Sequence, residues 1–175
     1  LDYLKRMQEL LDIPVYLMTE PELAAEPALD IRPWGWDAAL RKRLSGLGVD
    51  ESLLPSMQQI SVWREYSHRS KSVSLLPELQ LDEHFCGESY YLKTPEEWKS
   101  FVEEREGCLL KAPLSGSGKG LNWCKGTFTP FISGWCTRVA ALQGGVIAEP
   151  IYNKVEDFAL EFYSDGAGEV MFAGY

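Results

Sequence analysis

A glycine-rich loop between two apolar segments holds the residues best suited to chemistry. The loop reads LSGSGKG over residues 114–120, after Cys108–Lys111 and before Leu121–Cys124. Glycines have no Cβ, so backbone N–H groups in such a loop can approach phosphate oxygens closely. Lys119 adds positive charge at the tip, and Lys111 would lie below it. These residue types predict an anion site, and phosphate is the anion that they suit best.

The distribution of charge around the loop favours the same interpretation. The 175-residue chain carries a net charge of −9, yet no Asp or Glu occurs between Glu106 and Glu149. The basic residues within that stretch are Lys111, Lys119, Lys125 and Arg138. Because the whole molecule would repel polyanions, we expect no general affinity for nucleic acid or anionic membranes, and any anion must be bound locally.

Two common phosphate-binding motifs do not match the loop. A Walker A loop needs glycine where the chain has Pro113, and Ser or Thr where it has Gly120. A Rossmann fingerprint, G-x-G-x-x-G, opens a helix, whereas this loop leads into the strand-like Leu121–Cys124. Two interpretations remain: a flexible phosphate-binding flap between antiparallel strands, or an ordinary glycine hairpin with two solvated lysines.

The cysteines, histidines and apolar runs bear on the class of protein. The chain has four cysteines without a C-x-x-C pair and two histidines, so we predict no zinc site. Cysteines in a chain of this length favour buried, reduced thiols and hence a cytoplasmic location. No apolar run approaches the roughly 20 residues that span a bilayer, so we expect no membrane segment.

The first half of the chain is predicted to be mainly helical. Apolar spacing indicates four helices, with Asp37 as the N-cap of the second. The predicted helices cover residues 1–11, 37–47, 56–66 and 67–76. Residues 13–18 could form a short strand, and the repeated prolines of residues 20–33 indicate a loop. We assign residues 1–85 to this leading region.

The second half, residues 86–175, mixes strands and helices. The sequence Thr94-Pro95-Glu96-Glu97 is a capping box that starts a helix, and Gly107 is placed to end it. A second helix is predicted over 133–142. Strands are predicted near Tyr90 and over 108–111, 121–124, 146–148, 158–163 and 169–175. This order predicts an α+β fold, an antiparallel sheet with a glycine-rich flap and two helices.

The series of elements resembles the ATP-grasp enzymes over roughly residues 90–175. A strand that ends in lysine, LLKAP, precedes the glycine and serine flap; a helix follows; and a strand delivers an acid into a hinge, VIAEPIY over residues 146–152. The resemblance implies the N-terminal, nucleotide-gripping lobe of an ATP-grasp domain. The activity it implies is that of a carboxylate ligase, in which ATP activates a carboxylate as an acyl phosphate that an amine or thiol attacks.

The resemblance also assigns parts of ATP to residues of this chain. Lys111 would contact the phosphates, and Glu149 would face the adenine amino group. The flap that would close over the phosphates consists of Ser115, Gly116, Ser117, Gly118, Lys119 and Gly120. In the hinge, which is Pro150, Ile151 and Tyr152, the Pro150 carbonyl would accept from the amino group and the Tyr152 N–H would donate to a ring nitrogen. Proline suits this role because only its carbonyl is used.

Several residues have alternative interpretations. For the ribose hydroxyls we favour Asp157 over Glu156, although both acids could belong to a solvated face. A second phosphate contact could come from Arg69 or Lys71. Glu149, taken without the resemblance, could equally be a surface acid at the end of a strand. Trp98, Trp123 and Trp135 are expected to pack in the core or under the flap.

The resemblance further implies two Mg²⁺ ions, whose ligands, with an arginine for the acyl phosphate, would follow Tyr175. We therefore interpret the chain as the N-terminal part of a longer ligase, inactive alone. The alternative is a nucleotide-binding or protein-interaction module without chemistry. A kinase-like lobe is disfavoured, because there the flap precedes the lysine strand, whereas Lys111 comes before this flap.

Overall fold

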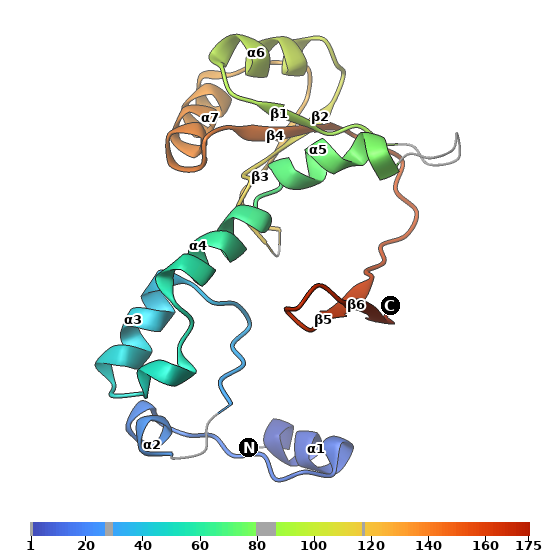
Figure 1. Cartoon of the computed structure of the whole chain (residues 1–175). Helices are drawn as coiled ribbons and strands as arrows, with labels where there is room; N and C mark the ends of the chain where they lie inside the picture. The colour runs from blue at the N-terminus through green and yellow to red at the C-terminus, as the bar shows by residue number, and fades with distance from the viewer. Residues whose placement is uncertain (1, 27–29, 80–86, 117) are drawn as a thin grey trace. The chain divides into compact units, whose positions relative to one another are not determined.

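The computed structural model describes residues 2–26, 30–79, 87–116 and 118–175 of the chain. Two compact units are present, Leu1–His68 and Arg69–Tyr175 (Figure 1). The sequence placed the division after residue 85 instead. Helix α5 (Ser70–Leu79) contacts strand β1 (Tyr90–Leu92), which explains why this helix groups with the second unit. The predicted end of the leading region, residues 80–85, lies outside the described residues.

The first unit is helical, as predicted. Its elements are α1 (Asp2–Leu11), α2 (Glu20–Ala25), α3 (Ala38–Gly46), the 3₁₀ turn η1 (Glu51–Leu53) and α4 (Met57–Tyr66). Side-chain caps start two of them: Asp37 accepts from the Leu40 N–H at 2.7 Å, and Ser56 accepts from the Gln59 N–H at 3.2 Å. A small core of Leu44, Val49 and Leu54 holds this unit together.

Two predictions for the first unit were wrong. Residues 13–18 form no strand, since no strand is described in this unit that could pair with them. Residues 20–25 form α2 rather than a loop. The Glu22 carboxylate accepts the Thr19 N–H at 2.7 Å, and Pro21 lies in the first turn, where a missing N–H does no harm.

The second unit is built on a four-stranded sheet in the order β1–β4–β2–β3. Strand β4 is Val146–Pro150, β2 is Cys108–Lys111 and β3 is Leu121–Cys124, and every neighbouring pair is antiparallel. Helix α6 (Pro95–Glu103) connects β1 to β2, and α7 (Pro130–Gln143) connects β3 to β4. The mixture of helices with an antiparallel sheet confirms the predicted α+β fold class.

The ends of the helices in this unit show which of the predicted start and stop signals set the helix limits. Thr94 caps α6 as predicted, with its hydroxyl accepting the Glu97 N–H at 3.3 Å. The helix ends at Glu103, with Glu104 as its C-cap, rather than at Gly107. A Cβ at Gly107 would lie 3.1 Å from Ile151 Cδ1, so this glycine serves close packing instead. Helix α7 starts three residues earlier than predicted, capped by Thr129, and α5 runs through Pro77 to Leu79, beyond its predicted end at residue 76.

The two faces of the sheet carry different residues, because side chains alternate along each strand. One face packs against α6 and α7, which lie on the same side of the sheet (Figure 1). The buried residues between these layers are Trp98, Phe101, Val102, Cys108, Leu110, Cys124, Ile132, Cys136, Val146 and Ala148. The opposite face presents Leu109, Lys111 and Glu149, which are half-buried.

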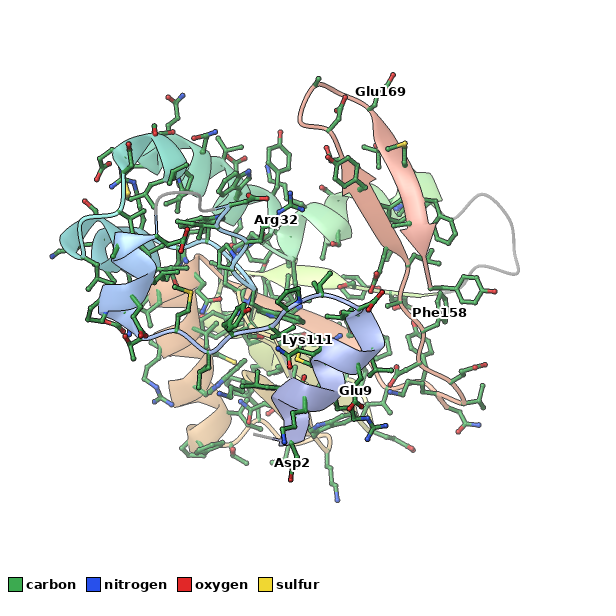
Figure 2. The ribbon with its side chains drawn as sticks, turned by 90° about the horizontal axis from the view of Figure 1, so that it is seen from below. Asp2, Glu9, Arg32, Lys111, Phe158 and Glu169 are labelled. Carbon is green, nitrogen blue, oxygen red and sulfur yellow. The ribbon has the colours of Figure 1, made fainter. Side chains whose placement is uncertain are left out.

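The last two strands form the predicted hairpin, which is a two-stranded sheet separate from the four-stranded one. Strands β5 (Glu161–Ser164) and β6 (Val170–Gly174) pair antiparallel, with Phe162 opposite Phe172. Glu169, beside the turn, is labelled in Figure 2. The first strand starts later than the predicted residue 158. Among the described residues, no helix combines the length and apolarity needed to cross a bilayer.

Candidate functional site

A cleft of about 800 Å³ lies on the sheet face that α6 and α7 leave open. Its walls come from strands β2, β3 and β4, the glycine-rich loop, the segment that follows β4, and the start of α5. The lining residues are Arg69, Leu109, Lys111, Gly118, Lys119, Leu121, Trp123, Glu149, Pro150, Ile151, Tyr152, Asn153, Lys154, Val155, Glu156 and Asp157. Three stretches of the second unit that are distant in sequence, namely Arg69, residues 109–123 and residues 149–157, therefore meet at one site.

Lys111 and Glu149 form an ion pair inside the cleft. Lys111, labelled in Figure 2, ends β2, and Glu149 lies on the neighbouring β4. The register pairs Lys111 with Ile147 and Leu109 with Glu149, so the two charged side chains share one face and are diagonal neighbours. Their side chains are only 22% and 25% exposed, and the Ser89 hydroxyl donates to Glu149 Oε1 at 3.3 Å.

The glycine-rich loop closes the β2–β3 hairpin with unusual backbone geometry. The Ala112 N–H donates to the Gly120 carbonyl at 2.8 Å, and the Lys119 N–H donates to the Gly116 carbonyl at 3.0 Å. Gly118 and Gly120 have φ values of +74° and +69°, which L-residues rarely adopt. A Cβ at Gly120 would also lie 2.8 Å from Ser115 Cβ. The glycine at 120 is therefore needed for both conformation and space.

Arg69 fixes the base of this loop. Its Nη1 donates to the Ala112 carbonyl at 2.7 Å and to the Ser115 hydroxyl at 2.8 Å. Its backbone N–H donates to the Pro113 carbonyl at 3.2 Å. Arg69 also lines the cleft. This arginine thus connects the start of α5 to the loop and places a permanent positive charge at the site.

The segment after β4 forms the other wall. Pro150 is the last residue of the strand, and residues 151–157 continue along the cleft without regular structure. The Lys154 N–H donates to the Tyr152 carbonyl at 2.9 Å, which turns the chain. Lys154 Nζ also pairs with Asp157 at 2.6 Å on an exposed stretch. Hydrogen bonds between near neighbours shape this wall.

The floor of the cleft is apolar. Leu109, Leu121 and Trp123 lie on the open face of β2 and β3, and Leu109 is opposite Trp123 in the register. The Trp123 side chain is 65% exposed, unlike Trp98, which is buried in the core at 3%. Packing of Trp123 in the core is therefore excluded, because the alternation of β3 points it away from the helices, and Trp123 instead lines the cleft with Gly118 and Lys119 of the loop.

The cleft brings together most of the residues proposed from the sequence. Lys111, Gly118, Lys119, Glu149, Pro150, Ile151, Tyr152, Asp157 and Glu156 line it, as does Arg69. Among the described residues, Ser115, Gly116, Gly120 and Lys71 are not part of its wall. Ser115 instead bonds to Arg69, and Gly120 closes the hairpin. Ser117 lies outside the described residues.

Six lining residues were not proposed from the sequence: Leu109, Leu121, Trp123, Asn153, Lys154 and Val155. The alternation of the two strands was the signal that could have found the first three. Once Lys111 is placed on the open face, residues two positions away in β2, and the partners of both in β3, must share that face. No comparable signal marks residues 153–155, which have no regular structure.

The cysteines that the structure describes belong to the core rather than to the cleft. Cys108, Cys124 and Cys136 are free thiols, and all three are buried. Burial raises the pKa of the Cys124 and Cys136 thiols to about 12 and also raises the pKa of Cys108. Within the described part of the chain, no three His, Cys, Asp or Glu side chains are grouped so as to hold a metal ion.

Comparison with known proteins adds no relative. The chain matches no protein-family model, no curated protein and no solved structure.

Proposed function

We propose that the second unit binds the nucleotide of ATP in this cleft. The observation that carries the proposal is the convergence of a strand-end lysine, a glycine-rich loop and a strand-end acid on one sheet face. An apolar floor beside charged and hydrogen-bonding walls suits a ligand with a flat aromatic base at one end and phosphates at the other. The ATP-grasp resemblance, which rests on the same residues, implies the same ligand.

In this proposal the phosphates lie between Lys111 and the glycine-rich loop. Lys119 is exposed on the loop, and Arg69 holds the loop base, so both cations can add to the attraction for phosphate. Of the two alternatives for the second phosphate contact, Arg69 is favoured, because it lines the cleft and Lys71 is not part of the described wall. The loop contributes backbone N–H groups that glycine leaves uncovered.

The base lies over the apolar floor, toward β4 and the hinge. Glu149 is then placed to accept from an amino group, and Pro150, Ile151 and Tyr152 follow directly along the same wall. Asp157 and Glu156 are the acids available for the ribose hydroxyls. Asp157 is held by Lys154, and the carboxylate can still accept from hydroxyls because it has two oxygens.

The activity that we propose is that of an ATP-dependent carboxylate ligase. Such a reaction needs Mg²⁺ to neutralise the phosphates. The described residues offer no grouped ligands for a metal ion, so no Mg²⁺ ligand is assigned in this unit. What this unit would contribute is the binding and orientation of the nucleotide, so that the γ-phosphate is presented to a carboxylate substrate.

Calorimetric titration with Mg-ATP tests the binding proposal. Lys111→Ala should lower the affinity about tenfold or more, since charge-assisted bonds to phosphate are worth about 1.5–3 kcal/mol. Lys125→Ala is the matched control, because Lys125 is an exposed lysine of the same acid-poor stretch and is outside the cleft wall. Equal affinities in the two variants would refute the assignment of Lys111.

Trapping with hydroxylamine separates a ligase from a binding module. An acyl phosphate reacts with hydroxylamine to give a hydroxamate, so a protein that binds ATP should form hydroxamates from a panel of carboxylates if it is a ligase. Because the N-terminal part is expected to be inactive alone, the test is made on the full-length protein, where binding of ATP without any hydroxamate or ADP would favour the non-catalytic module.

A further inference from the structure

We propose that the Lys111–Glu149 ion pair makes the cleft selective, rejecting free polyphosphate and admitting nucleotides whose base carries an exocyclic amino group. This inference rests on the proposed function, because it concerns the same cleft. It adds a second role for Glu149, the exclusion of free polyphosphate. This role is not needed for the binding of a base.

The Lys111–Glu149 ion pair is placed so that an anion does not easily replace Glu149 as the partner of Lys111. Both side chains are about three-quarters buried, so solvent screens their attraction less than at an exposed site. Among the described residues, the other partner of Glu149 is the Ser89 hydroxyl at 3.3 Å. An anion that draws Lys111 away therefore leaves a half-buried carboxylate with a single long hydrogen bond, which is unfavourable.

A free polyphosphate meets this obstacle in full. It offers oxygens that can replace Glu149 as the partner of Lys111, but it has no donor that can replace Lys111 as the partner of Glu149. The Glu149 carboxylate would also repel the polyphosphate, because the two are negatively charged and would lie on the same sheet face. Two other cations of the wall are already engaged, since Arg69 is held by the loop and Lys154 is paired with Asp157. Any attraction from Lys119 and Arg69 acts on the phosphates of a nucleotide as well as on free polyphosphate, so it does not favour the free anion.

A nucleotide with an amino group on its base meets both demands at once. Phosphate oxygens accept from Lys111, and the amino group donates to Glu149, so neither partner of the broken pair is left alone. A base with a carbonyl oxygen at that position would instead present an acceptor to a carboxylate. Sites that hydrogen-bond a ligand group discriminate strongly against analogues that lack it. ATP should therefore be preferred over ITP, which differs in this group.

The test measures the affinity of tripolyphosphate, ATP and ITP by calorimetry. Glu149→Gln removes the charge while keeping the size of the side chain. We expect this variant to bind tripolyphosphate about tenfold more tightly than the unaltered protein and to lose most of the preference for ATP over ITP. Glu161→Gln, which removes an equal charge from an exposed position outside the wall, should change neither quantity. Circular dichroism checks that each variant is folded.

A double variant shows whether the gain in tripolyphosphate affinity depends on Lys111. In a Lys111→Met background, Glu149→Gln should raise the affinity for tripolyphosphate much less than in the unaltered background, because only the repulsion by the carboxylate is removed and there is no lysine to release. If the unaltered protein binds ATP but Glu149→Gln changes neither the tripolyphosphate affinity nor the ATP-to-ITP ratio, the selectivity inference is overturned and nucleotide binding stands. If only the tripolyphosphate affinity rises and ATP never binds, the ion pair excludes anions and the nucleotide assignment is wrong.

Discussion

The two faces of the four-stranded sheet differ in what their residues do, although they are made from the same strands. On the helix-covered face, Leu110 is fully buried in an apolar layer. One residue further, Lys111 is on the open face and forms an ion pair. Alternation along β2 thus separates stability from binding at the scale of a single residue.

This separation has a practical consequence for variants. Changes to the buried residues of the helix-covered face should mainly alter the free energy of unfolding, whereas changes to the residues that line the cleft should mainly alter affinity. Ile147 lies on the open face but is only 1% exposed, so its truncation should also lower stability. A variant that changes both equally would contradict the division.

The largest expected effect is the difference in thiol reactivity between the folded and the denatured protein for cysteines of the helix-covered face. Raising a thiol pKa from 9.0 to about 12, as for Cys124 and Cys136, lowers the thiolate fraction at pH 8 about a thousandfold. Iodoacetamide should therefore leave these residues unlabelled in the folded protein and label them in denaturant. Peptide mass spectrometry reads each site separately, and rapid labelling of folded Cys124 would contradict its burial.

The same thiols predict how stability depends on pH. The folded state keeps their protons to a higher pH than the unfolded state does, because burial raises their pKa values. Their contribution is fully present below about pH 9 and is lost as the pH rises toward about 12. Replacing Cys124 with Ala should reduce this alkaline loss of stability, measured by denaturant unfolding at several pH values.

Leu110→Ala should give the largest loss of stability. Truncation of a fully buried leucine leaves a cavity and costs about 2–5 kcal/mol. Leu109→Ala is the matched control: the neighbouring leucine is half-buried on the open face and should cost about 1 kcal/mol. Urea unfolding followed by tryptophan fluorescence measures both, and similar losses would show that the open face also carries the core.

Gly120→Ala should have a smaller but still clear effect. The positive φ and the close approach of Ser115 make a side chain at this position unfavourable by about 1–3 kcal/mol. Gly116→Ala is the control, since nothing lies within 4 Å of a Cβ there. We expect Gly120→Ala to disturb the loop and weaken ATP binding more than Gly116→Ala. Equal ATP affinities in the two variants would mean that the loop geometry is unimportant for the ligand.

The sequence predicted the elements of the second unit better than those of the first. Capping residues and apolar alternation are local, so the α6 start at Thr94 and the limits of β2 and β3 could be predicted. The helix α2 was missed because repeated prolines were interpreted as loop signals, although Pro21 lies in a first turn, where proline is tolerated.

The features of the candidate site that depend on residue type could be predicted from the sequence. The features that depend on which residues contact one another could not. Lys111 and the loop were proposed from their chemistry, and Glu149 from the resemblance to the ATP-grasp family. That Lys111 pairs with Glu149 depends on β2 and β4 being neighbours, which is a property of the sheet order. That Arg69 holds the loop depends on a contact between residues 43 positions apart in sequence. Neither relationship leaves a local pattern.

Trp123→Ala should produce the smallest effect, and only on binding. The side chain is 65% exposed above the apolar floor, so its loss should change stability by less than about 0.5 kcal/mol. A base that stacks on the ring would lose about 1 kcal/mol, or roughly fivefold in ATP affinity, whereas Trp123→Phe should keep most of it. Quenching of tryptophan fluorescence by ATP should also disappear in both variants, because the other described tryptophans are outside the cleft wall. Unchanged quenching in Trp123→Phe would place the base elsewhere and would leave the open face with a role for phosphates alone.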